Sequence, residues 1–152
     1  RKTGVRSFEA SAFLRRCGAD VTRVRKMFRN DMAEYKARAE AVRHAEVYRG
    51  AFAISMCPGK VDSPTIVGAQ AADELLNIVG IKASFVLTEY QGRIFISSRS
   101  IDEINVQLIM ERLGGGHLNV AGAQLADCTL SEAKVKLQDT IDEMLEEGEI
   151  EL

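Results

Sequence analysis

The residues best suited to chemistry are three consecutive glycines followed by a histidine: Gly114, Gly115, Gly116 and His117. Each glycine costs about 1 kcal/mol in a helix interior relative to alanine, so the run predicts a sharp bend between a helix and a strand. Backbone N–H groups that lack a neighbouring Cβ atom can approach a ligand closely, and bends of this kind suit anions, above all phosphate. His117 adds a side-chain donor. The alternative interpretation is an ordinary helix C-cap that leads into a loop.

A second candidate is Arg99, which is followed by Ser100 at the junction of a predicted strand and a predicted helix. A guanidinium group there can bind a phosphate or the edge of a base through two parallel hydrogen bonds. A structural ion pair is an equally open interpretation of Arg99. For Ser100, we expect a helix-capping role more than a ligand contact.

Several sequence motifs of catalytic and nucleotide-binding sites are absent from this chain. The two histidines, His44 and His117, are far apart, and His44 is expected on a helix surface. There is no Asp-His-His or HExxH grouping, no G-x-S-x-G elbow and no Walker loop. The three cysteines are odd in number and widely spaced, which argues against disulfides and favours a reducing, cytosolic setting. We therefore expect no metal site from this chain alone, while a Ser-His-Asp nucleophile set stays open.

Composition and charge indicate one globular domain with an appendage. Apolar residues make up 46% of the 152 residues, and no apolar run approaches the ~20 residues of a membrane-spanning helix. Residues 1–49 carry a net charge of +7, residues 50–126 carry −2, and residues 127–152 carry −7. The basic segment suits a polyanion or an acidic partner domain, unless its arginines simply lie on solvated helix faces. Since the chain begins with Arg1, we expect it to be a piece of a longer protein.

Hydrophobic periodicity and capping signals predict an α/β fold: a mixed sheet of about four to five strands flanked by helices, preceded by a helical N-terminal arm. The boundary is expected near Gly50, with an arm at 1–49 and a sheet domain at 50–152. A Gln91-Gly92 hairpin turn is predicted between two of the strands. The expected helices are 8–17, 21–28, 31–48, 64–79, 100–113 and 129–147, and the expected strands are 51–57, 84–90, 93–98 and 120–126.

These residues resemble a known family. The glycine-histidine run, Arg99-Ser100, Asn105-Val106 and Ala121-Gly122 resemble the DHH-associated domain at the C-terminal end of DHH-family phosphoesterases. A narrower similarity, covering nearly the whole chain, is to GdpP/YybT-type cyclic di-AMP phosphodiesterases. The segments that carry it are 1–10, 70–73, 83–86 and 105–111.

The resemblance implies a preceding DHH domain that holds two manganese ions and hydrolyses cyclic di-AMP to pApA with metal-activated water. It implies no metal in this fragment, and because the fragment contains no DHH motif, we expect it to bind the nucleotide without hydrolysing it. The implied partners are the cyclic dinucleotide, the DHH domain of the same chain and a homodimer. It also implies a membrane-anchored parent with this part in the cytoplasm. The residues implied to bind the nucleotide are Arg99, Ser100, Gly114, Gly115, Gly116 and His117, and Arg6 is a further candidate for contact in the cleft.

Two departures from the family pattern leave the substrate open. Members of this branch often carry one more glycine before the histidine, and Ala121-Gly122-Ala123 replaces their usual Ala-Ala-Thr. One alternative function is a nucleic-acid-binding module of a RecJ-like exonuclease or of a short-oligonucleotide phosphoesterase, with single-stranded nucleic acid as the ligand. Another is a purely structural or dimerisation domain.

Overall fold

The computed structural model describes residues 4–29, 31–57, 63–101, 104–115 and 122–152. The chain divides into two compact units, which we call the arm unit (Arg1–Asp31) and the sheet unit (Met32–Leu152). Helix α3 (Met32–Arg43) therefore belongs to the same compact unit as the sheet, although the sequence analysis placed it in the arm. The two units are described separately.

The arm unit consists of helices α1 (Val5–Arg16) and α2 (Val21–Met27). The Asp20 side chain caps α2 by accepting a 2.8 Å hydrogen bond from the Thr22 N–H group. The helix expected from residue 8 begins earlier, at Val5, because nothing in residues 5–7 interrupts a helix. None of the described residues of this unit is buried. Its exposed apolar side chains include Phe8, Phe13, Leu14, Met27 and Phe28.

The sheet unit is built on a five-stranded mixed sheet, which confirms the predicted α/β class. Its strands lie in the spatial order β1-β2-β3-β4-β5; β2 and β3 are parallel, and the other neighbouring pairs are antiparallel. The Gln91-Gly92 hairpin is confirmed, since both residues have positive φ and connect Tyr90 to Arg93. The strands are β1 (Glu46–Tyr48), β2 (Phe52–Cys57), β3 (Ala83–Tyr90), β4 (Arg93–Ser100) and β5 (Gly122–Ala126).

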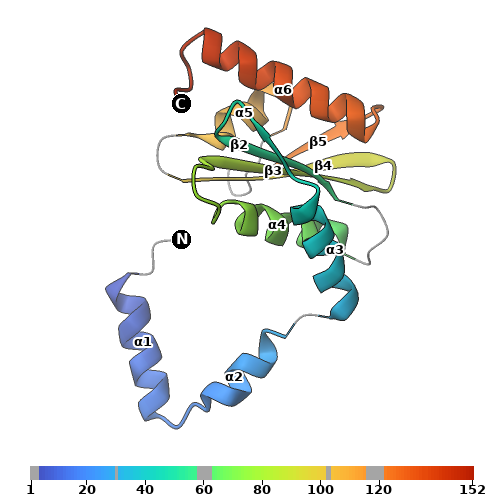
Figure 1. Ribbon diagram of the computed structural model, residues 1–152. Helices are drawn as coiled ribbons and strands as arrows, with labels where there is room; N and C mark the ends of the chain where they lie inside the picture. Colours follow the sequence, from blue (N-terminus) through green and yellow to red (C-terminus); the bar gives the residue numbers. More distant parts are fainter. Residues whose placement is uncertain (1–3, 30, 58–62, 102–103, 116–121) are drawn as a thin grey trace. The chain divides into compact units, whose positions relative to one another are not determined.

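Helices cover both faces of this sheet (Figure 1). On one face α3 and α4 (Pro64–Leu75) pack on β2, β3 and β4. On the other face lie α5 (Val106–Arg112) and α6 (Leu130–Glu146). The α5/α6 face holds the larger core, which includes Phe52, Phe85, Ile96, Ile109 and Leu137. The α3/α4 face holds a smaller core of mainly short side chains, among them Ala53, Val67, Ala71, Leu75 and Val86.

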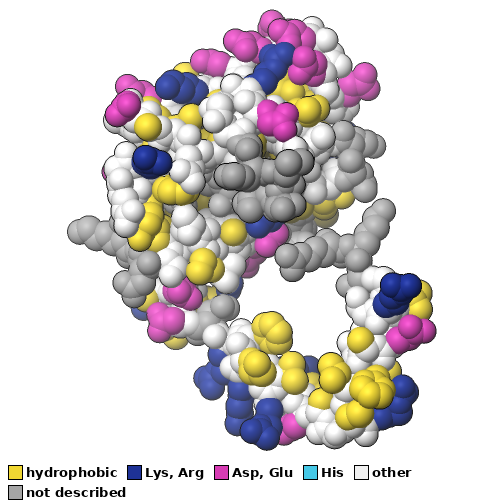
Figure 2. All heavy atoms as spheres, turned by 180° about the vertical axis from the view of Figure 1, so that it is seen from behind, with side chains coloured by type: hydrophobic (Ala, Val, Ile, Leu, Met, Phe, Trp, Pro, Cys, Tyr) yellow, Lys and Arg dark blue, Asp and Glu magenta, His cyan; other side chains and the backbone are white. Residues whose placement is uncertain are grey.

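Charge separates the two helical regions as the sequence indicates. Figure 2 shows acidic side chains gathered over α6, whereas arginine and lysine side chains accompany hydrophobic ones on the arm helices. The acidic helix α6 begins with a capping box at Thr129 and Glu132, and this predicted start is confirmed.

Three predicted helix boundaries in the sheet unit are wrong. The helix expected to reach Tyr48 ends at Arg43, because Arg49 and Gly50 take positive φ and turn the chain so that β1 pairs with β2. The helix expected to reach Val79 ends at Leu75. Ser100 does not cap a helix: it pairs with Ala83 as the last residue of β4.

Candidate functional site

The first two glycines of the glycine-histidine run form the C-terminal cap of α5. Gly114 has a φ of +79°, and its N–H group donates to the Glu111 carbonyl oxygen at 3.0 Å. The Gly115 N–H group donates to the Met110 carbonyl oxygen, also at 3.0 Å. These two bonds are those of a Schellman motif, which satisfies the last carbonyl groups of a helix. The C-cap interpretation therefore holds for these two residues.

Gly115 is also required by packing. A Cβ atom on this residue would lie 2.3 Å from the Cα atom of Ala123 and 2.4 Å from its Cβ atom. The backbone after α5 thus runs directly against β5, and only glycine fits there. Gly116 and His117 lie outside the described residues, so a phosphate contact at those two positions stays a prediction. A ligand that used the Gly114 or Gly115 N–H group would have to replace a bond of the helix cap.

Arg99 lies on β4 and contacts α4. Its Nε atom donates to Asp73 Oδ1 at 2.8 Å, and its Nη1 atom donates to the Ser98 carbonyl oxygen at 2.8 Å. The Arg99 side chain is 32% exposed and that of Asp73 is 65% exposed. Among the described residues, no hydrogen-bond partner is present for Nη2 of Arg99. The ion pair proposed as one interpretation is present, and the two bonds fix the guanidinium group without engaging Nη2 among the described residues.

The structure does not bring the Arg99 and Ser100 side chains to the same face of the sheet. Successive strand residues point to opposite faces, and Arg99 lies opposite Ser84 while Ser100 lies opposite Ala83. The Ser84 hydroxyl donates to the Ala72 carbonyl oxygen at 2.7 Å, which places Arg99 on the α4 side. The cap of α5 is instead Asn105, whose side chain accepts from the Gln107 N–H group at 3.0 Å.

Arg6 lies on α1 in the arm unit and is exposed. Its predicted contact in the cleft stays a prediction, because it belongs to the other compact unit.

A second arginine, which the sequence did not mark as a candidate, also binds α4. Arg38 on α3 is only 16% exposed; its Nε atom lies 3.1 Å from Glu74 Oε2, and its Nη1 atom donates to Gln70 Oε1 at 3.2 Å. Its guanidinium carbon lies 5.1 Å from the centre of the Tyr35 ring. The available signal was the i, i+4 spacing of Gln70 and Glu74, which places both on one side of α4. A shallow pocket of about 350 Å³ is lined by Arg38, Gln70, Asp73, Glu74 and Asn77.

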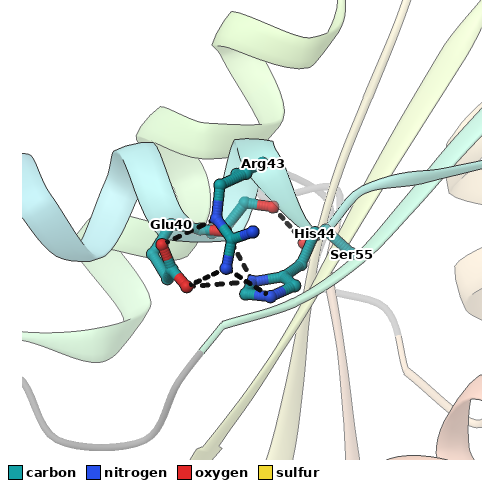
Figure 3. Close-up of polar contacts among 5 residues, drawn as sticks. Glu40, Arg43, His44 and Ser55 are labelled. Carbon is teal, nitrogen blue, oxygen red and sulfur yellow. Dashed lines mark hydrogen bonds and ion pairs between the residues drawn. The ribbon is translucent and has the colours of Figure 1, made fainter.

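His44 lies at the end of α3, on the surface as expected (Figure 3). Its Nδ1 atom is 3.1 Å from the Glu40 carbonyl oxygen, and Arg43 Nη2 is 2.8 Å from its Nε2 atom. The Arg43 hydrogen bond lowers the pKa of the Glu40 carboxyl group. Nearby, the buried Ser55 hydroxyl donates to the Ala41 carbonyl oxygen and joins β2 to α3. This group of residues closes a helix end and provides no nucleophile.

A metal site is not assembled in the described part of the chain. There, no group of three or more His, Cys, Asp or Glu side chains converges in a way that could hold a metal ion. The donor set of these residues does not fit manganese.

Comparison with known proteins agrees with this fold. The chain is 41% identical to cyclic-di-AMP phosphodiesterase PdeA of Listeria monocytogenes over 93% of its length, and 39% identical to cyclic-di-AMP phosphodiesterase GdpP of Bacillus subtilis over 97%. It spans 22% and 23% of those two proteins. An exopolyphosphatase-related protein from Bacteroides fragilis has the same fold, with a TM-score of 0.77 and 18% identity over 93% of this chain and 44% of that one.

The family itself is matched over most of the sheet unit. The DHHA1 domain matches residues 50–147, which include strands β2 to β5 and helices α4, α5 and α6. The resemblance to the DHH-associated domain, and the narrower one to cyclic di-AMP phosphodiesterases, are both confirmed. The chain belongs to the DHHA1 domain family.

Proposed function

We propose that this chain is the substrate-binding portion of a DHH-family phosphodiesterase that hydrolyses cyclic di-AMP to pApA. The observation that carries the proposal is the 41% identity to a cyclic-di-AMP phosphodiesterase over 93% of the chain. Arg99 supports it, because two hydrogen bonds hold its guanidinium group and leave donors available for a phosphate oxygen. In this proposal Gly116 and His117 provide further phosphate contacts.

Hydrolysis would need residues that this chain does not contribute. Its 152 residues contain no Asp-His-His motif, and its described acidic and histidine side chains do not converge. In the proposal, two manganese ions are held by a DHH domain of the same polypeptide, and this chain grips the nucleotide beside them. We further propose, from the family resemblance, that the parent is anchored in a membrane with this part in the cytoplasm. In the described part of the chain itself, no helix is long and apolar enough to cross a bilayer.

The test has two measurements. Calorimetric titration of the chain with cyclic di-AMP should give saturable binding. Incubation of the chain with cyclic di-AMP and manganese should release no pApA. Turnover by the chain alone would contradict the proposal that hydrolysis needs the DHH domain. Absence of cyclic di-AMP binding would contradict the proposed substrate-binding role.

The arm unit supports a second candidate function, binding of single-stranded nucleic acid. Its helices combine exposed Phe8, Phe13 and Phe28 with several arginines, and basic surfaces with aromatic side chains suit stacked bases and phosphates. Affinity for an oligonucleotide that falls steeply as salt rises would favour this function, since polyanion binding releases counterions. The first proposal expects cyclic di-AMP to bind with a much weaker salt dependence.

A further inference from the structure

One part of the sheet on the α4 side is less covered than the rest. On β4, Ile94, Ile96 and Ser98 are buried by the α5/α6 face, whereas the alternating residues Phe95 and Ser97 are only half-buried. We call the residues on this less covered face, at the edge of the sheet formed by β4 and β5, the β4 strip. It comprises Phe95, Ser97 and Arg99 with their neighbours Tyr90, Gly122 and Gln124.

The register places this strip on the same face as α4. Ser97 lies opposite Val86, and a Cβ atom added to Gly68 of α4 would lie 3.5 Å from Ser97 Oγ and 3.7 Å from Val86 Cγ1. Across the other edge of β4, Ser97 lies opposite Gly122 and Phe95 opposite Gln124. Helix α4 buries the β3 residues of this face, but Gln124 on β5 remains exposed. The strip is therefore bordered by α4 on one side and open on the other.

The chemistry of the strip suits a base and a phosphate at opposite ends. Phe95 and Arg99 are four residues apart, so they are separated by about 13 Å along the strand. The Phe95 ring packs against Tyr90, with centroids 6.2 Å apart and an angle of 59° between the rings, which restricts its orientation. On the two strands, the small residues Ser97 and Gly122 lie between the ring and the guanidinium group, and Gly68 of α4 lies beside Ser97. The strip itself has no acidic member, and Arg93 adds a second positive charge on this face.

We propose that the β4 strip is a nucleobase subsite, in which a base stacks on Phe95 while a phosphate of the same ligand binds Arg99. The Gln124 amide has both donors and an acceptor to offer the edge of the base. A free phosphate could occupy only the arginine end, so a ligand that uses the whole strip is a nucleotide. This inference rests on the proposed function and adds the place where the base is recognised.

The experiment compares ligands that differ in the base. Calorimetry measures binding of cyclic di-AMP, AMP and ribose 5-phosphate to the wild-type chain and to Phe95→Leu, which keeps an apolar side chain but removes the aromatic ring. Loss of one stacked base is expected to weaken cyclic di-AMP and AMP binding by roughly 5- to 100-fold. Ribose 5-phosphate, which has no base, should bind both proteins equally. Phe95→Tyr, which keeps the ring, should bind like the wild type.

The control is Tyr35→Leu, which removes a more exposed aromatic ring from α3 in the same compact unit. It should leave all three affinities unchanged, and thermal unfolding of each variant establishes that it is folded. If Phe95→Leu binds cyclic di-AMP as tightly as the wild type, or weakens ribose 5-phosphate equally, the subsite is wrong while the proposed function stands. If the wild-type chain binds neither nucleotide, both proposals fail together.

Discussion

Helices α5 and α6 end in the same bend, and the one difference between them explains much of the glycine run. Gly148 follows α6 with a φ of +71°, and its N–H group donates to the Leu145 carbonyl oxygen, just as Gly114 caps α5. The next residue donates back into the helix in both cases, but it is Glu149 after α6 and Gly115 after α5. The α5 end runs directly against strand β5. The first glycine is therefore a requirement of the cap, and the second a requirement of packing on β5.

The largest expected effect in this comparison is at Gly115. Gly115→Ala should lower the free energy of unfolding of the sheet unit by about 3 kcal/mol, because its Cβ atom would overlap the backbone of Ala123. Urea unfolding followed by circular dichroism measures the change. Glu149→Ala at the equivalent position after α6 is the control, and it should cost no more than about 0.5 kcal/mol. Equal losses at the two sites would mean that the close approach to β5 is not real.

A smaller and matched effect is expected at the first glycine of each cap. Gly114→Ala and Gly148→Ala should each cost about 1 kcal/mol, because alanine is strained at positive φ. Neither Cβ atom would meet another described atom within 4 Å, so strain alone should set both values. Thermal unfolding of the two variants in parallel measures the difference. A loss at Gly114 several times that at Gly148 would show that the two caps are not equivalent.

The smallest expected change in the free energy of unfolding concerns Asp142 on α6. Asp142 accepts hydrogen bonds from Arg49 at 2.7 and 3.0 Å and from the Tyr48 hydroxyl at 2.8 Å, and the Arg49 bonds lower the pKa of its carboxyl group below the usual 3.8. A lowered pKa in the folded state means stability that is present above about pH 4 and lost as the pH falls through the folded value. Asp142→Asn should therefore cost less than about 1 kcal/mol at pH 7.

The same variant gives the pH dependence directly. Unfolding measured from pH 7 to pH 2 should show the wild type and Asp142→Asn converging at the acidic end, because protonation removes the charge that the substitution removes. A difference that persists unchanged at pH 2 would show that the carboxylate charge is not what joins α6 to β1.

The sequence predicted the architecture of the sheet unit more fully than it predicted the roles of individual residues. Periodicity and turn chemistry were sufficient for the α/β class, the Gln91-Gly92 hairpin and the start of α6, because each depends on neighbouring residues. Strand β1 was missed because three residues carry too little pattern, and its pairing with β2 depends on the turn at Arg49 and Gly50. The roles of Gly115 and Asp73 could not be predicted, since each depends on a partner from a distant part of the chain: Ala123 on β5 for Gly115, and Arg99 on β4 for Asp73.

Arg99 lies on the face of the sheet opposite to the α5 cap. Arg99 and Arg112 are matched arginines: both belong to the sheet unit, both are about one-third exposed, and both pair with surface carboxylates. Arg112 binds Glu147 and Glu149 on the α5/α6 face, whereas Arg99 binds Asp73 on the α3/α4 face. The proposed ligand contact distinguishes them.

The most direct measurement is therefore the calorimetric dissociation constant for cyclic di-AMP of Arg99→Gln beside that of Arg112→Gln. Loss of a charge-assisted contact to phosphate should raise the constant roughly 10- to 100-fold in Arg99→Gln. Arg112→Gln should bind as tightly as the wild type, with both variants folded. Unchanged binding by Arg99→Gln, or an equal loss in both variants, would contradict a nucleotide site at Arg99.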